Sequence, residues 1–227
     1  MKILFIGKDR EDFYFDQAKA FMLQQFPDVE VVLAAPGSKF PTAYENWKGD
    51  YLISYLCPWV IPGKLIDNLK YGAINFHPGP PQYPGSGCTN FAIYHEVKEY
   101  GVTCHYMAAK VDSGKVIAVR RFDVFPEDTV WSVTQRCYGY MLALFYEIIT
   151  MVKEGKPLPV SDESWSRDAY RLKDFHALRR ITPDMDEAEI QRRIRATTYP
   201  GYEGAYMEIA GAKFVFKEYL AHKQDQS

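Results

Sequence analysis

The stretch AINFHPGPPQYPG, residues 73–85, joins a short apolar strand to a stiff loop. Residues two apart in an extended chain face the same side, so Asn75 and His77 should project together while Phe76 points into a core. The prolines and glycines that follow end the strand and shape the loop. A polar pair at the end of an apolar strand, facing such a loop, predicts a site of chemistry.

The residues that precede this stretch predict the opening of an α/β fold. Residues 2–7 form an apolar run ending in glycine, which is typical of a buried strand in a parallel sheet. Residues 16–26 carry apolar side chains at close to helical spacing, and residues 29–34 read as a second strand. Strand, helix and strand in this order predict a doubly wound, mainly parallel sheet. Charged residues 8–12 stand where a glycine fingerprint for a dinucleotide would be, so NAD is not expected.

The remaining chain predicts more of the sheet and then a change of character. We expect further strands over 51–56, 72–77, 101–107 and 116–124, and helices over 64–69, 90–97 and 129–154. Asp128 is the expected N-cap of the last helix, and Gly155 its stop. Beyond it we expect a linker, a short helix over 186–195 and a β-hairpin over 205–219 that turns near Ala210. Two regions are therefore predicted, a catalytic domain over 1–155 and a small helix-and-hairpin appendage over 156–227.

Composition excludes several classes of function. With 47% hydrophobic and 25% charged residues, the 227-residue chain has the make-up of a soluble globular protein. A net charge of -2 gives no general attraction for nucleic acid or for an anionic membrane. The four cysteines form no CxxC motif, and the histidines match no compact metal motif, so no metal is expected. The first residues enter a strand directly and lack a signal peptide, which predicts a cytoplasmic location.

Asn75, His77 and Asp112 have the side-chain types that an amine attacking a carbonyl carbon needs. Histidine exchanges a proton near neutral pH, asparagine donates to a developing oxyanion, and aspartate orients and charges an imidazole. A GxSxG elbow is absent from the sequence, which favours direct transfer between two bound substrates. From the residues alone, His77 also reads as a structural histidine and Asp112 as a β-turn residue. We expect His105, on the neighbouring strand, to be structural support.

Several motifs occur together in one order, namely Asn75-Phe76-His77-Pro78, the Gly85 loop, Gly101-Val102-Thr103-Cys104-His105 and Val111-Asp112-Ser113-Gly114-Lys115-Val116-Ile117. This series resembles the formyltransferases that use N10-formyltetrahydrofolate. The pair Arg195-Ala196, with the segment 199–202, resembles the part that follows their catalytic core. The resemblance implies a Rossmann-like core, a folate pocket, and catalytic roles for Asn75, His77 and Asp112.

The loop after the histidine departs from the commonest family pattern. It reads Pro78-Gly79-Pro80-Pro81 instead of Ser-Leu-Leu-Pro, and in this it resembles the nucleotide-sugar N-formyltransferases of surface-polysaccharide biosynthesis. These act on a dTDP-linked 4-amino-4,6-dideoxyhexose or its 3-amino isomer. An atypical methionyl-tRNA formyltransferase, which would need a basic face, is one alternative. A non-catalytic folate- or nucleotide-binding module is another.

Ligand-binding residues follow from the ends of the predicted strands, where such sheets bind ligands. The expected folate-binding residues are Cys57, Pro58, Trp59, Val60, Ile61, Val111, Ser113 and Gly114. For the amino sugar we expect Tyr83, Gly85 and Asn90, and for its diphosphate Lys8 and Arg10. Structural roles remain open for Trp59, for the sugar-loop residues and for the two cations. The hairpin is apolar on both faces of one strand and needs a cover, for which we favour a homodimer over packing on the main domain.

Overall fold

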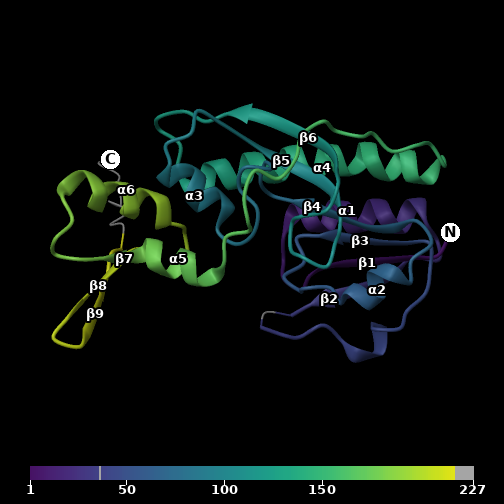
Figure 1. Ribbon diagram of the computed structural model, residues 1–227, viewed down its shortest axis with the longest axis horizontal. Helices are drawn as coiled ribbons and strands as arrows, with labels where there is room; N and C mark the ends of the chain where they lie inside the picture. Colours follow the sequence, from purple (N-terminus) through teal and green to yellow (C-terminus); the bar gives the residue numbers. More distant parts are fainter. Residues whose placement is uncertain (36, 218–227) are drawn as a thin grey trace, which may run out of the picture.

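The computed structural model describes residues 1–35 and 37–217, and a six-stranded sheet forms its centre (Figure 1). The strands are β1 (Ile3–Lys8), β2 (Glu30–Ala34), β3 (Tyr51–Tyr55), β4 (Gly72–His77), β5 (Glu99–Tyr106) and β6 (Val116–Asp123). Their order is β2-β1-β3-β4-β5-β6. The pairs among β1 to β4 are parallel, and β5 and β6 are added antiparallel. The predicted α/β class with a mainly parallel sheet is confirmed.

Helices cover both faces of the sheet, which is why β1 is buried along its whole length. The helices of this part are α1 (Phe13–Gln25), α2 (Gly63–Asp67), α3 (Cys88–Tyr94) and α4 (Val130–Lys153), with a 3₁₀ turn over Thr42–Tyr44. Phe5 of β1 packs against Phe15 of α1 and Phe145 of α4 on one face. On the other face Leu4 shares a smaller core with Leu65 of α2. Side-chain alternation along one strand thus supplies two cores.

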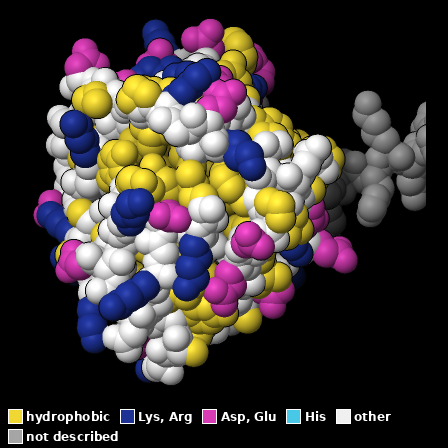
Figure 2. Space-filling model, turned by 90° about the vertical axis from the view of Figure 1, so that its right-hand side faces the viewer, with side chains coloured by type: hydrophobic (Ala, Val, Ile, Leu, Met, Phe, Trp, Pro, Cys, Tyr) yellow, Lys and Arg dark blue, Asp and Glu magenta, His cyan; other side chains and the backbone are white. Residues whose placement is uncertain are grey.

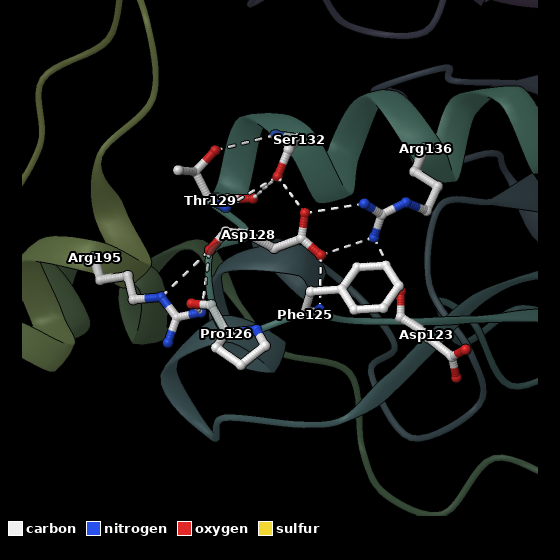
Figure 3. Close-up of polar contacts among 8 residues, drawn as sticks. All are labelled: Asp123, Phe125, Pro126, Asp128, Thr129, Ser132, Arg136 and Arg195. Carbon is white, nitrogen blue, oxygen red and sulfur yellow. Dashed lines mark hydrogen bonds and ion pairs between the residues drawn. The ribbon is translucent and has the colours of Figure 1, made fainter.

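The start of α4 corrects one prediction. The N-cap is Thr129, whose side chain accepts a hydrogen bond from the backbone N–H of Ser132, and not Asp128. The Asp128 carboxylate instead accepts from the Ser132 hydroxyl, the backbone N–H of Phe125 and the guanidinium of Arg136 (Figure 3). An arginine two turns into the helix holds the Asp128 carboxylate, and the neighbouring Thr129 occupies the capping position.

The C-terminal part contains more structure than the sequence predicted. The expected short helix is α6 (Glu187–Thr197), and the expected hairpin is β8 (Tyr206–Ile209) with β9 (Ala212–Val215). The sequence predicted neither helix α5 (Leu172–Arg179) nor strand β7 (Arg180–Ile181). Strand β7 pairs with the hairpin in a second sheet of order β7-β8-β9. The end of the predicted hairpin, at 218–219, lies outside the described residues. The division of the chain near residue 155 stays a prediction.

The hairpin turns at Ala210 and Gly211, both at positive φ, as expected. Ile209 and Phe214 are exposed on it. The homodimer that would cover them stays a prediction. Within residues 1–35 and 37–217, no helix is both long and apolar enough to cross a bilayer. The same described residues hold no group of three or more His, Cys, Asp or Glu side chains arranged around a metal ion.

Candidate active site

The three predicted catalytic side chains meet at the carboxyl end of β4. Nδ1 of His77 lies 3.3 Å from an Asp112 carboxylate oxygen, and both side chains are buried. Antiparallel pairing of β4 with β5 sets Asn75 opposite His105. The Asn75 amide nitrogen is therefore 3.1 Å from Nε2 of His105, which is itself 3.3 Å from the other Asp112 oxygen. His105 thus links Asn75 to Asp112. The sequence analysis expected only structural support from His105, whereas the structure places it within the site.

Asp112 is held in an unusual backbone conformation. Its φ is 42°, in the left-handed region that residues with a Cβ rarely adopt. The backbone N–H of Gly85 donates to the carboxylate at 2.7 Å. Burial by itself would raise the pKa of Asp112, but the positive charges and donors of His77, His105 and Gly85 outweigh it and hold the pKa well below its usual range. The site therefore keeps a fixed negative charge beside two imidazoles.

The contacts of His77 fix the orientation of its ring. Nε2 lies 2.8 Å from the carbonyl oxygen of Tyr83, and Nδ1 faces the ionised Asp112. A carbonyl oxygen only accepts, so Nε2 donates in the contact with Tyr83, and Nδ1 is the nitrogen beside the carboxylate. In His105, by comparison, Nδ1 donates to the carbonyl of Tyr106 at 2.8 Å, and Nε2 remains for Asn75 and Asp112.

Two glycines allow the loop after β4 to wrap this closely. A Cβ on Gly79 would lie 2.7 Å from Nε2 of His77. Gly85 has φ +87°, and a Cβ there would lie 2.3 Å from the carbonyl oxygen of Tyr170. Glycine at these positions lets the backbone approach the imidazole on one side and the following chain on the other.

A first cavity of about 590 Å³ opens onto Asn75, His77 and Asp112. Its wall includes six of the eight predicted folate residues: Cys57, Pro58, Trp59, Val60, Ile61 and Val111. Ser113 and Gly114 do not line it. The Ser113 hydroxyl donates to a turn carbonyl, and the Gly114 carbonyl accepts from the indole N–H of Trp165. Burial raises the pKa of the Cys57 thiol to about 11, so this side chain acts as part of an apolar wall.

A second cavity of about 740 Å³ adjoins the first, and Pro78 lines both. Of the residues predicted for the amino sugar and its diphosphate, it contains Arg10 and Asn90, whereas Gly85 lines the first cavity. Arg10 donates to the hydroxyl of Tyr202 at 2.9 Å. The other polar and aromatic groups of this wall were not predicted as binding residues, and they include Tyr138, Phe175, Arg179, Tyr199 and Glu203.

The structure does not bring Lys8 and Tyr83 to the lining of either cavity. The Lys8 ammonium is buried and pairs with Asp12, which also caps α1. Burial lowers its pKa, although the Asp12 carboxylate counteracts this. The Tyr83 ring is buried, with its hydroxyl 3.1 Å from Nδ1 of His95. Both residues were predicted as ligand-binding from their polarity and their place near a strand end. That pattern could not show that Asp12 and His95 would be their partners inside the protein.

A cluster around Asp128 fastens two walls of the second cavity together (Figure 3). Arg195 of α6 donates to the backbone carbonyls of Pro126 at 2.9 Å and Asp128 at 3.1 Å. The Asp128 carboxylate binds Arg136 of α4 at 2.8 Å. Burial would raise the pKa of Asp128, but Arg136, the Phe125 N–H and Ser132 lower it to about 2. The cavity is lined by Val130, Thr134, Gln135 and Tyr138 of α4, by Thr197 at the end of α6, and by Tyr199, Tyr202 and Glu203 after it.

Comparison with known proteins places this geometry in a family. GDP-perosamine N-formyltransferase of Brucella melitensis is 27% identical over 179 residues, which are 78% of this chain and 68% of that protein. Methionyl-tRNA formyltransferase of Dictyoglomus thermophilum is 28% identical over 78% of this chain and 58% of its own length.

Two solved structures share the fold over nearly the whole chain. A sugar N-formyltransferase from Shewanella superposes with a TM-score of 0.76 and 20% identity, covering 96% of both chains. An N-formyltransferase from Helicobacter canadensis, solved with folinic acid and dTDP-3-aminofucose, has a TM-score of 0.71 and 18% identity over 93% of this chain and 85% of that one. Residues 29–147, which include Asn75, His77 and Asp112, match the family model described as formyl transferase. The protein therefore belongs to the formyl transferase family.

Proposed function

We propose that the protein transfers a formyl group from N10-formyltetrahydrofolate to the amino group of a nucleotide-linked amino sugar. The observation that supports this most directly is the place of Asn75, His77 and Asp112, beside Pro78, where two cavities adjoin. A transferase without a covalent enzyme intermediate needs its donor and acceptor side by side at such a point.

The first cavity suits the folate. Trp59 and its neighbours give it an apolar wall next to the turn that carries Asp112. The indole of Trp59 is fixed by hydrogen bonds from its N–H to the Ser38 carbonyl and hydroxyl, both at 3.0 Å. A rigid, mostly apolar wall with a few polar groups at one end fits a flat heterocycle whose reactive formyl group faces Asn75 and His77.

The second cavity suits the nucleotide sugar. Arg10 and Arg179 place two guanidinium groups on its wall, and these fit the oxygens of a diphosphate. Phe175, Tyr199 and Tyr202 offer flat faces for a base. As acceptor we propose a dTDP-linked 4-amino-4,6-dideoxyhexose or its 3-amino isomer. The relatives named above carry GDP- and dTDP-linked sugars in their names or structures, so GDP-linked amino sugars belong in the same test, with UDP-linked ones as a third nucleotide.

In the proposed reaction the sugar amine attacks the formyl carbon, a C–N bond to the sugar forms, and the bond from that carbon to N10 breaks. The Asn75 amide and the His77 imidazole stabilise the formyl oxygen as it becomes negative. The amine loses one proton and N10 gains one, so protons balance; His77 carries this proton through Nε2, which leaves the Tyr83 carbonyl to reach the substrates. Asp112, beside Nδ1, orients the imidazole.

A tRNA acceptor is the second candidate, because a methionyl-tRNA formyltransferase is among the relatives. It is disfavoured by the net charge of -2. On the face shown in Figure 2, Lys and Arg are interspersed with Asp and Glu around a hydrophobic centre. A pure binding module would hold folate and nucleotide without turnover, and the complete Asn75, His77 and Asp112 set argues against it.

The test is mass spectrometry of dTDP-, GDP- and UDP-linked amino sugars after incubation with N10-formyltetrahydrofolate. We expect one acceptor to gain a single formyl group. Asp112→Asn serves as the matched control and should leave that acceptor unmodified. Formylation of methionyl-tRNA with no reaction on any amino sugar would support the second candidate instead, and ligand binding without any product would support a binding module.

A further inference from the structure

We propose that Trp165 is a positioning residue of this active site, which holds the two imidazoles and the Asp112 turn in place. The inference rests on the proposed function for its kinetic part. Trp165 lies in the polar stretch 161–168, which the sequence predicts to be a linker or an extended arm and which precedes α5. Figure 1 shows the chain after α4 running back along β6 before it reaches this helix.

The indole of Trp165 contacts both imidazoles of the site. Its ring centroid is 4.9 Å from that of His105 and 5.8 Å from that of His77, in edge-to-face arrangements of 85° and 71°. Such arrangements bring the positive edge of one ring to the negative face of another. Trp165 is not part of the lining of either cavity, so it packs behind the imidazoles.

The same side chain also holds the turn that carries Asp112. The indole N–H donates to the carbonyl oxygen of Gly114 at 2.8 Å, two residues after Asp112. This turn needs support because Asp112 itself is at φ 42°. Trp165 therefore contacts the turn that carries Asp112 and also the two imidazoles that pair with the Asp112 carboxylate.

The segment that delivers Trp165 is anchored on both sides of it. The backbone N–H of Ser161 donates to Val116 on β6, and that of Ser166 donates to Pro81 in the loop after His77. Further on, the ring of Tyr170 stacks on Phe91 of α3 with centroids 3.8 Å apart. Contacts before and after Trp165 in the chain therefore fix the position of its indole.

These contacts predict a specific kinetic effect. Removing the indole leaves His77 and the Asp112 turn free to adopt other orientations and lets water reach the far side of the rings. Neither cavity loses a lining group, so the binding of both substrates should change little while the chemical step slows. A role in packing alone would instead lower thermal stability and leave the turnover of folded protein unchanged.

The experiment compares Trp165→Leu, which loses ring and N–H, with Trp165→Phe, which keeps a ring but loses the hydrogen bond. Trp131→Phe, an exposed tryptophan on α4, is the matched control. We expect kcat to fall about tenfold or more in Trp165→Leu and less in Trp165→Phe, with both KM values within twofold of wild type and the control unchanged. A kcat within twofold in folded Trp165→Leu, or a loss confined to one KM, would overturn the proposal.

An NMR readout separates this inference from the proposed function. In ¹H–¹³C spectra of the histidine rings, ring currents of Trp165 should displace the signals of His77 and His105. Both signals should move and broaden in Trp165→Phe and Trp165→Leu, whereas those of His95 and His176 should not. If no acceptor is found, this result still supports the positioning role. Unmoved, sharp His77 and His105 signals would reject it, whatever the enzyme transfers.

Discussion

The carboxylate of Asp112 lies 3.3 Å from Nδ1 of His77, and that aspartate holds a left-handed backbone conformation with φ 42°. Residues with such backbone strain persist only where the surroundings fix them. Here the fixing contacts are His77, His105, the Gly85 N–H and, through Gly114, Trp165. Groups from different strands and loops therefore hold Asp112 in place, as expected for a carboxylate that must stay ionised and keep its orientation.

Gly85→Ala should damage both stability and turnover. The substitution meets the Tyr170 backbone at 2.3 Å and 2.7 Å, and shifting this loop would withdraw the N–H that binds Asp112. We expect a loss of unfolding free energy of about 1–3 kcal/mol, by urea titration, and a lower kcat. The matched control is Gly155→Ala, also at positive φ (+65°) but with nothing within 4 Å. Equal losses in the two variants would show that the contact with Tyr170 has no part.

The Asp128 cluster should give the protein an acid-sensitive source of stability. The pKa of Asp128 is lowered to about 2 in the folded protein, below its value of 3.8 in the unfolded chain. A lowered carboxyl pKa stabilises the fold above the unfolded value and loses that stabilisation as pH falls through the folded value. Asp128→Asn should therefore be less stable than wild type at pH 7, on the order of 2 kcal/mol, with the difference shrinking between about pH 4 and 2. A difference that stays constant from pH 7 to pH 2, in urea unfolding, would contradict the assignment.

Arg195→Lys should affect the acceptor more than the donor. Lysine cannot reproduce the fork that reaches the carbonyls of Pro126 and Asp128, so the two walls of the second cavity should separate. We expect KM for the nucleotide sugar to rise about tenfold, equivalent to about 1.4 kcal/mol, with KM for the folate within twofold. Arg192→Lys, an exchange elsewhere on α6, is the control. Equal rises in both KM values would point to general loosening of the fold instead.

Local patterns predicted the sheet, and they also predicted that Asn75 and His77 share one face of a strand, because each depends on neighbours in sequence. The apolar run of β1 and the alternation Asn75-Phe76-His77 set burial and direction within one strand. The antiparallel β4–β5 pair then brought His105 beside Asn75.

Long-range packing explains what the sequence did not predict. The segment of Trp165 reads as polar, yet it is ordered by contacts with β6, the loop after His77 and α3. Two aromatics, Trp165 and Tyr170, in an otherwise polar stretch were the available signal. The burial of Lys8 was also not predicted. Residue type alone does not distinguish a lysine that is buried in an ion pair with Asp12 from one that is free to bind a ligand.

The central claim is that Asn75, His77 and Asp112 carry out formyl transfer between the two cavities. The most direct measurement is the turnover of His77→Asn and Asp112→Asn with N10-formyltetrahydrofolate and the acceptor found by mass spectrometry, in protein that still binds both ligands. We predict a fall in kcat of about 100-fold or more for each variant, the size of effect seen when a preorganised charge or donor is lost. Near-normal turnover in either variant would contradict the account.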